Sequence, residues 1–341
     1  MDADVQNLTR TAIDLSGSVP GGRLRKPIET VPIGSGGSDR QFYRIVSGDR
    51  TAILMVQHGG GPEFERYLSL GDFLARCGIG VPRFYGVDGK RGAILMEDFS
   101  DTHLEDAVGD ADEDHVLILY RQCIETLVRL SSDVAESMYR NEILTDRVFS
   151  ESTLLGESDY FIREFLLDYC GIDPPGGFDS ERSVIARTVA EEPCVFMHRD
   201  FQSRNIMIKE DRIRIIDFQT AHRGPGLYDA ASLLKDPYHP LAEGLRRTLL
   251  EELHGRLRES GAAVASGFDE FTYRFTIAGI QRHMQALAAF ARLGIKKEKH
   301  RFLESIPNGL SLLEGGIREI NSFPVMQGMI ASIREKLTKG R

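Results

Sequence analysis

Several features are scarce or missing in this 341-residue chain, and each absence excludes a class of protein. The four cysteines are scattered without C-x-x-C spacing, which excludes a cysteine-ligated zinc site and a disulfide framework and indicates reduced thiols in the cytoplasm. No apolar run approaches the roughly 20 residues of a membrane helix, and the acidic N-terminus lacks a signal-peptide pattern. Lysine and arginine number 42 against 51 acidic residues, and a net charge of −9 argues against a general nucleic-acid binder. We therefore expect a cytoplasmic protein with no membrane and no nucleic-acid partner.

The patterns along the chain change in character near residue 100. Before it, β-prone segments alternate with turns; beyond it, apolar residues recur at the three- and four-residue spacing of helices. The sequence predicts an α+β fold with a small β-rich N-lobe, 1–98, and a larger helical C-lobe, 99–341. Strands are expected at 28–33, 41–46, 51–57, 81–87, 93–96, 194–197, 206–208 and 213–216. Helices are expected within 1–25 and at 62–77, 103–108, 115–130, 145–155, 159–170, 180–190, 227–234, 241–260, 268–293, 298–319 with an interruption at Pro307, and 324–339. A turn is expected at 223–226.

One segment in the middle of the chain contains the polar residues on which the functional prediction depends. The expected strand 194–197 is followed by H-R-D-x-x-x-x-N, then by a β-hairpin with its turn at 209–212, and Asp217 ends the second hairpin strand. A hydroxyl that accepts a phosphoryl group must lose a proton, so Asp200 is expected to act as the base. The oxygens of Asn205 and Asp217 suit Mg²⁺. Aspartate and asparagine are ordinary loop residues, but this order is typical of kinase-like phosphotransferases.

A glycine-rich turn separates the first two expected strands and consists of Gly34, Ser35, Gly36, Gly37 and Ser38. Glycine lets backbone N–H groups approach phosphate oxygens without interference from a Cβ atom. A glycine run between strands is also a common flexible hairpin. Its position ahead of the strand pair and of the catalytic segment favours a loop that covers the phosphates of ATP.

The third expected strand, 51–57, contains no lysine, although protein kinases use a lysine there to bind the α and β phosphates. Two arginines could replace its charge. We expect Arg44 to contribute to ATP binding. We expect Arg204, within the catalytic loop, to stabilise the negative charge of the γ-phosphate or of the transition state. The alternative is that both pair with carboxylates such as Asp39 or Asp200.

The catalytic segment resembles the aminoglycoside phosphotransferase-like superfamily, whose fold is that of the protein kinases. The residues that show the resemblance are HRDFQSRNIMI and IIDFQTAHRGPGLYDAASLLKDPY, and they span most of the segment 193–238. Within the superfamily, the chain looks most like the bacterial kinases that phosphorylate the anomeric hydroxyl of N-acetylmuramate and N-acetylglucosamine. HRDF in place of HGD, the pattern DFQ-x-A-x-RGP-x-x-YD and the later block IQRHMQALAAFARLGI indicate this group. The resemblance extends from residue 33 to residue 313.

The resemblance also implies roles for residues outside the catalytic motif. It places the backbone of Glu97 to Phe99 at a hinge that faces adenine, and it makes Asp229 a structural brace of the HRD loop. It further implies that Gln219 contacts the sugar.

Three adjacent polar residues, Gln281, Arg282 and His283, lie in an otherwise apolar helical segment, so at least one should face inward. Their side chains are either satisfied structural groups or, as the resemblance allows, sugar contacts.

The resemblance implies an ATP- and Mg²⁺-dependent kinase that acts on an amino sugar in cell-wall recycling. Two alternatives stay open. The first is a kinase of another small alcohol, such as an aminoglycoside or choline. The second is a pseudokinase that binds nucleotide without catalysis, which the missing strand lysine permits and the presence of Asp200, Asn205 and Asp217 argues against.

Overall fold

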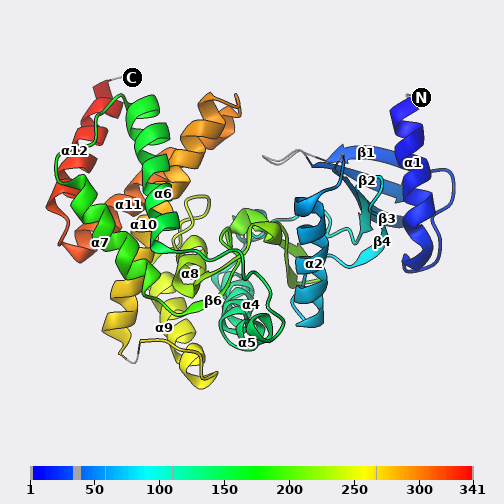
Figure 1. Cartoon of the computed structure of the whole chain (residues 1–341), viewed down its shortest axis with the longest axis horizontal. Helices are drawn as coiled ribbons and strands as arrows, with labels where there is room; N and C mark the ends of the chain where they lie inside the picture. Colours follow the sequence, from blue (N-terminus) through cyan, green and yellow to red (C-terminus); the bar gives the residue numbers. More distant parts are fainter. Residues whose placement is uncertain (1–2, 34–39, 58, 110, 266, 340–341) are drawn as a thin grey trace. The chain divides into compact units, whose positions relative to one another are not determined.

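The computed structural model describes residues 3–33, 40–57, 59–109, 111–265 and 267–339 (Figure 1). Contacts divide the chain into two compact units. The first comprises residues up to 102 together with 206–219, and the second comprises 103–205 and 220 onward. The predicted lobe boundary between residues 98 and 99 stays a prediction.

The first unit is built on a five-stranded antiparallel sheet with the strand order β1-β2-β3-β5-β4. Its strands are β1 (Glu29–Ile33), β2 (Gln41–Ser47), β3 (Arg50–Val56), β4 (Phe84–Asp88) and β5 (Ala93–Met96), and its helices are α1 (Ala3–Leu15) and α2 (Pro62–Arg76). Alternate residues of β3 face opposite sides of the sheet. Ala52, Leu54 and Val56 join a core cluster that includes Ala12 of α1. On α2, Tyr67 donates a hydrogen bond to Met96 of β5. Since both faces are covered, β3 is a continuous apolar run rather than an alternating one.

A two-stranded hairpin also belongs to the first unit. It consists of β7 (Ile206–Lys209) and β8 (Arg212–Ile215), paired from Ile206 opposite Ile215 to Lys209 opposite Arg212. The two turn residues, Glu210 and Asp211, have positive φ angles of 53° and 55°. Two consecutive residues of this kind are typical of a type I′ turn, whose twist matches that of the strands.

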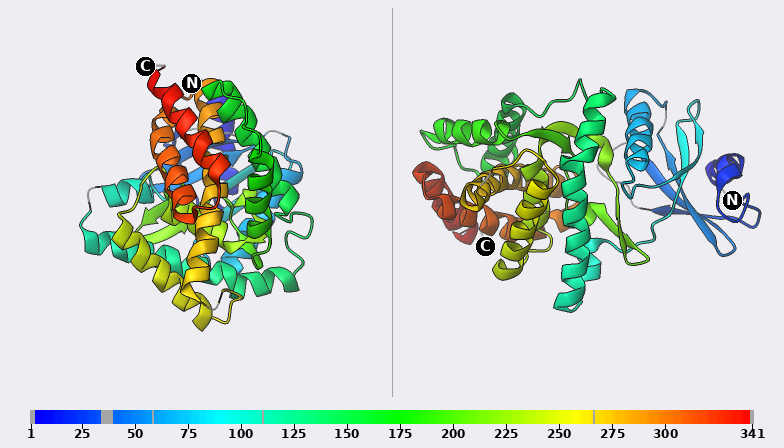
Figure 2. Two further views of the ribbon diagram at one scale, coloured as in Figure 1. Left: turned by 90° about the vertical axis from the view of Figure 1, so that its left-hand side faces the viewer. Right: turned by 90° about the horizontal axis from the view of Figure 1, so that it is seen from below.

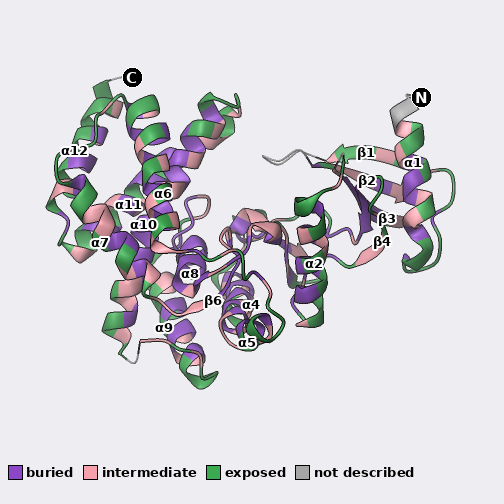
Figure 3. Ribbon diagram, viewed as in Figure 1, coloured by how far each residue is buried: buried purple, intermediate pink, exposed green. Residues whose placement is uncertain are grey.

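The second unit is mainly helical. Its helices are α3 (Leu104–Gly109), α4 (Glu113–Ser131), α5 (Asp133–Arg140), α6 (Glu151–Phe161), the π-helix Ile162–Cys170, α7 (Phe178–Ala190), α8 (Gly226–Leu234), α9 (Glu243–Glu259), α10 (Phe268–Ile295), the 3₁₀ helix His300–Ser305, α11 (Ile306–Ile320) and α12 (Pro324–Lys339). Ten consecutive residues of α10, from Phe275 to Met284, are buried, as Figure 3 shows by colour. A helix buried on all sides must be surrounded by others. Helices α6, α7, α8 and α11 all contact it, and Figure 2 shows it from two further directions.

Most expected elements are confirmed, and four details differ. Helix α5 was not predicted, α6 begins after its N-cap Ser150 rather than at 145, and the segment 162–170 forms a π-helix. The expected turn at 223–226 is wrong, because His222–Pro225 forms strand β9 and pairs with β6 (Cys194–Met197). Glycine fits this strand because a Cβ on Gly224 would lie 2.6 Å from the sulfur of Met197. Within the described residues, no helix is long and apolar enough to span a membrane.

Candidate active site

The loop that contains Asp200 follows β6 in the second unit, and carboxylates hold its backbone. Asp229 on α8 accepts hydrogen bonds from the backbone N–H groups of His198, at 2.6 Å, and Arg199, at 2.8 Å. Asp236 accepts one from the N–H of Ser203 at 2.7 Å. Both carboxylates are buried. Because the ends and middle of the loop are fixed in this way, the position of Asp200 is set by its surroundings rather than by the loop alone.

Burial raises the pKa of Asp229 to about 7, and the two backbone N–H groups oppose that rise. The resemblance implied that Asp229 braces the loop, and these hydrogen bonds show the brace. Asp236 was missed at the sequence level. Its sequence signal is weak, because Asp236 lies two residues beyond the end of α8 at Leu234, where helical spacing no longer applies.

A third carboxylate reaches the loop from α6. Arg199 in the loop has a φ of 78°, and its guanidinium lies 3.1 Å from the carboxylate of Glu157. The hydroxyl of Tyr228 donates a 2.8 Å hydrogen bond to the same carboxylate. Burial raises the pKa of Glu157, and the charge of Arg199 opposes that rise. The left-handed backbone of Arg199 is thus accompanied by a partly buried ion pair that fixes its side chain.

The carboxylate of Asp200, one-third exposed at 31%, faces the buried guanidinium of Arg282. Nη2 of Arg282 lies 3.4 Å from Oδ1 of Asp200 and donates a 2.9 Å hydrogen bond to Oε1 of Gln202. Its Nε donates a 2.8 Å hydrogen bond to the hydroxyl of Ser232. The planar guanidinium therefore links α8 and α10 to the catalytic loop, in a geometry that a single-point cation could not reproduce.

The other two members of the polar triplet in α10 point into the protein. Gln281 donates a 2.8 Å hydrogen bond to the carbonyl of Leu154, and Nε2 of His283 lies 2.8 Å from the carbonyl of Lys235. Both side chains are buried, and burial lowers the pKa of His283 to about 3, so its ring is neutral. Of the two roles that the sequence left open, this geometry favours structural groups over sugar contacts for Gln281 and His283.

Asn205 stands at the far end of the loop and is oriented by the loop itself. Its side-chain nitrogen donates a 2.9 Å hydrogen bond to the backbone carbonyl of Asp200. The amide oxygen is the remaining acceptor of this side chain. A hard oxygen of this kind suits Mg²⁺, which usually takes one or two protein ligands and completes its shell with water and phosphate oxygens. The donor type of Asn205 therefore fits the metal.

Arg204 is held by neighbours in its own unit. Its guanidinium forms two hydrogen bonds with the carboxylate of Glu105, one of them 3.0 Å long, and lies 3.8 Å from the ring centre of Tyr238. The sequence left two roles open for Arg204: stabilising the charge of the phosphoryl group, or pairing with a carboxylate. The structure shows a pairing, with Glu105 rather than with Asp39 or Asp200, and the role in phosphoryl charge stays a prediction.

The first unit contains the other predicted site residues. Asp217 follows β8 with a φ of 62°, and Nε2 of Gln219 lies 3.5 Å from its Oδ1. The next residue, Phe218, is fully buried and stacks on Tyr67 of α2 at 4.8 Å between ring centres. This stacking anchors the backbone beside Asp217 and leaves its carboxylate exposed. The predicted glycine-rich turn, Gly34–Ser38, lies outside the described residues.

Arg44 on β2 is paired twice. It forms a 2.8 Å ion pair with Asp98, whose side chain is 5% exposed, and a 2.7 Å ion pair with Asp101, which is 80% exposed. These carboxylates raise the pKa of Arg44, so its charge is permanent. As with Arg204, the structure shows the pairing that the sequence left open, and a contact with ATP stays a prediction.

The predicted hinge, Glu97–Phe99, is bound by a residue that was missed at the sequence level. Nζ of Lys209 lies 2.9 Å from both the carboxylate of Glu97 and the backbone carbonyl of Asp98. The N–H of Glu97 itself donates to the carbonyl of Arg83. The only sequence signal for Lys209 was its place beside the hairpin turn, which gives no indication of a partner 112 residues away.

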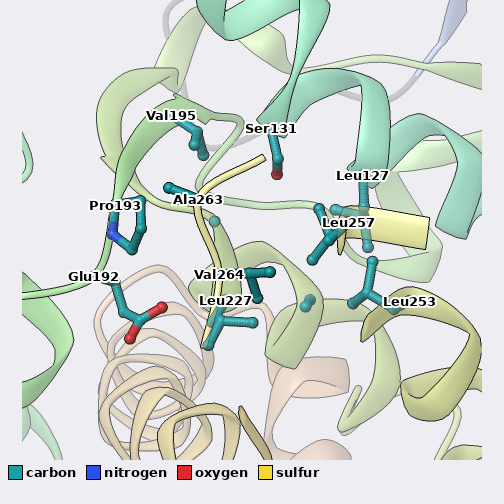
Figure 4. Close-up of a pocket in the computed structure, with 12 residues that line it drawn as sticks. Leu127, Ser131, Glu192, Pro193, Val195, Leu227, Leu253, Leu257, Ala263 and Val264 are labelled. Carbon is teal, nitrogen blue, oxygen red and sulfur yellow. The ribbon is translucent and has the colours of Figure 1, made fainter. Parts of the chain in front are cut away.

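Within the part of the chain that the structure describes, no three or more His, Cys, Asp or Glu side chains are grouped as a metal site. A small pocket of about 20 Å³ lies between α4, α9 and the start of α8, lined by apolar groups such as Leu127, Leu253 and Leu257 (Figure 4). Its volume suits one water molecule rather than a sugar.

The chain resembles several known proteins. Residues 29–264 match the model of the family described as phosphotransferase enzyme family. The chain is 26% identical over 314 residues to the N-acetylmuramate/N-acetylglucosamine kinase of Pseudomonas aeruginosa, covering 90% of this chain and 89% of the relative. It is 28% identical over 243 residues to the protein of the same name from Neisseria meningitidis serogroup B, covering 69% and 70%.

Two solved structures share the fold. The GDP complex of aminoglycoside 2'-phosphotransferase-IIIa superimposes with a TM-score of 0.60 at 15% identity, covering 92% of this chain and 99% of the other. A choline/ethanolamine kinase family protein from Mesorhizobium loti gives 0.59 at 15% identity, covering 96% and 99%. These likenesses confirm the predicted α+β kinase-like fold.

Proposed function

The chain belongs to the phosphotransferase enzyme family, and from this membership we propose that it transfers the γ-phosphoryl group of ATP to the anomeric hydroxyl of N-acetylmuramate or N-acetylglucosamine. The observation that carries the proposal is that three relatives are named N-acetylmuramate/N-acetylglucosamine kinase and align over 90%, 69% and 85% of this chain. The anomeric position of the hydroxyl is the finer part of the proposal. A role in recycling cell-wall sugars is part of the proposal.

In this proposal Asp200 accepts the proton of the sugar hydroxyl as the oxygen attacks the γ-phosphorus. Three features support it. The carboxylate is partly exposed, its loop backbone is fixed by Asp229 and Asp236, and Arg282 orients it from behind. A base held in one orientation lowers the entropy that must be lost on reaching the transition state.

We assign the metal to Asn205 and Asp217. When bound, Mg²⁺ would supply positive charge to the phosphate oxygens and to the departing diphosphate. The backbone of Glu97–Phe99 and the turn Gly34–Ser38 are proposed to bind adenine and the phosphates. Four residues were predicted to contact the sugar. Of these, Gln219 places its side-chain nitrogen near Asp217, and Arg282 places its guanidinium near Asp200, so these two keep the proposed sugar contact.

The experiment that tests this function measures ADP release with Mg²⁺ across a panel of acceptors: N-acetylglucosamine, N-acetylmuramate, their 1-O-methyl glycosides, kanamycin and choline. We expect turnover with the two free sugars and none with the glycosides, since their anomeric oxygen carries a methyl group. The product should be labile in acid, as anomeric phosphates are.

Equal activity on a 1-O-methyl glycoside would overturn the choice of hydroxyl. Turnover on kanamycin or choline alone would show that the chain is a kinase of another small alcohol. The solved structures of such kinases share only their fold with this chain. Binding of ATP without ADP release on any acceptor would indicate a pseudokinase.

A further inference from the structure

A second pocket, with a volume of about 290 Å³, lies among α9, α10 and the end of α11. Seven of its ten lining residues are polar or charged: Lys235, Glu243, Arg246, Arg247, Asp269, Thr272 and Glu319. Small-molecule pockets start at about this size. None of the residues assigned to catalysis lines this pocket.

A buried ammonium group forms one wall of this pocket. Lys235 is 5% exposed, and its nearest carboxylate, that of Glu319, lies 3.6 Å away. Its Nζ also lies 5.0 Å from the ring centre of Phe275. Its stem passes Gly279, where a Cβ would come within 3.1 Å of Cδ. The fold therefore accommodates a lysine in a position that is costly for a cation.

A second cation faces the same space. Arg246 is half-buried, and among the residues that the structure describes it makes no ion pair. Its charge contributes to the lowering of the Lys235 pKa to about 8, to which burial contributes most and which Glu319 opposes. Thr272 adds a buried hydroxyl that has no hydrogen-bond partner among the described residues. Lys235 also donates a 3.4 Å hydrogen bond to the hydroxyl of Thr276, and Glu319 balances one of the two positive charges. The second cation and the unpartnered hydroxyl of Thr272 would stabilise an anion bound beside them.

The carboxylates of Glu243 and Asp269 set the rest of the ligand chemistry. Both are exposed and line the pocket. Carboxylates repel additional negative charge and accept hydrogen bonds from hydroxyl groups. A ligand that suits the whole lining thus combines one compact dianion with a neutral, hydroxyl-bearing body.

We propose that this pocket binds a sugar phosphate, with the phosphomonoester between Lys235 and Arg246 and sugar hydroxyls toward Glu243 and Asp269. The site is separate from the one that contains Asp200. Arg282, which contacts Asp200, lies seven residues beyond Phe275 on α10, or about 10 Å along the helix. The two sites are connected through the chain, because Lys235 directly precedes the Asp236 that holds Ser203.

Isothermal titration calorimetry of the full chain without nucleotide tests the proposal, with glucose 6-phosphate, inorganic phosphate, gluconate and glucose as probes. We expect one saturable site for glucose 6-phosphate, weaker binding of inorganic phosphate, and no binding of gluconate or glucose. Loss of a charged hydrogen-bonding partner should weaken glucose 6-phosphate binding about 10-fold or more in both R246Q and K235M. The matched control is R258Q, an exposed arginine on α9 that does not line the pocket, and it should bind like the parent.

The proposal is overturned if glucose 6-phosphate gives no saturable binding, or if R246Q binds it as tightly as R258Q does. Binding of gluconate with equal affinity would overturn the phosphomonoester assignment. Because these measurements involve neither ATP nor turnover, their failure is distinct from a failure of the proposed kinase activity.

Discussion

The guanidinium of Arg282 lies 3.4 Å from the carboxylate of Asp200, although 82 residues separate the two in the chain. We predict that R282Q and R282K lower kcat about 10-fold or more and change the KM for ATP less than two-fold, because Arg282 orients the base without contacting nucleotide. R282K should not restore kcat, since lysine cannot reach Asp200, Gln202 and Ser232 together. Steady-state kinetics would measure this, with R274Q on the same helix as the control. A similar loss in R274Q would show a general effect of disturbing α10.

The two predicted carboxylates should fail in different ways. D200A should lose about 10² to 10⁴ in kcat, the usual contribution of a general base, and should bind ATP like the parent. D217A should also lose Mg²⁺-dependent nucleotide binding, because its carboxylate is proposed to hold the metal. Binding of a fluorescent ATP analogue with and without Mg²⁺ separates the two effects. Parent-like turnover in D200A would show that Asp200 is not the base.

Arg44 offers a matched pair of ion-pair partners. D98N should lower the free energy of unfolding by about 2 kcal/mol, because it removes a nearly buried carboxylate from a charged, hydrogen-bonded pair. D101N should change it by less than about 1 kcal/mol, because Asp101 is 80% exposed. Urea unfolding of both variants measures the difference. Equal losses would contradict the effect of burial.

Variants of Arg204 and Glu105 test whether Arg204 stabilises phosphoryl charge or only forms a structural ion pair. If Arg204 stabilises the negative charge of the transferred phosphoryl group, R204A lowers kcat about 10-fold or more. E105Q frees the guanidinium from its ion pair and should not lower kcat. R44A should instead raise the KM for ATP more than it lowers kcat. If R204A and E105Q reduce kcat equally, the ion pair itself is what matters and the phosphates are bound without Arg204.

The buried Lys235 predicts a pH dependence of stability. Its pKa is lowered from 10.5 to about 8 in the folded state, so between these values the unfolded chain binds more protons and stability rises with pH. The shift corresponds to about 3 kcal/mol at 1.36 kcal/mol per unit. Relative to K235M, the parent should therefore gain about that much unfolding free energy between pH 8 and pH 10.5. A constant difference between the two proteins across this range would contradict a lowered pKa.

Short-range patterns were sufficient to predict most of the helices and strands. The apolar run of β3, the turn at Glu210 and Asp211, and the helix from Phe268 each follow from neighbours within a few positions. Strand β9 was missed because Gly224 and Pro225 normally end strands. The glycine is explained by close approach of the Met197 sulfur and the Phe149 Cβ, which sequence neighbours do not reveal.

The partners of the site residues could not be predicted in the same way. Arg204 pairs with a carboxylate 99 positions earlier, and Lys209 binds a hinge 112 positions away. Several other acids were available to each, and no local pattern selects one.

The four groups that fix the catalytic loop all come from distant parts of the sequence. The separations are 31 residues from His198 to Asp229, 33 from Ser203 to Asp236, 42 from Arg199 to Glu157 and 82 from Asp200 to Arg282. Contacts between distant residues form slowly, because a long loop must close before any of them is made. The catalytic loop therefore reaches its final conformation only after α8 and α10 have docked. A chain arrested during synthesis before residue 282 would contain the complete H-R-D-x-x-x-x-N motif and still be unable to orient its base.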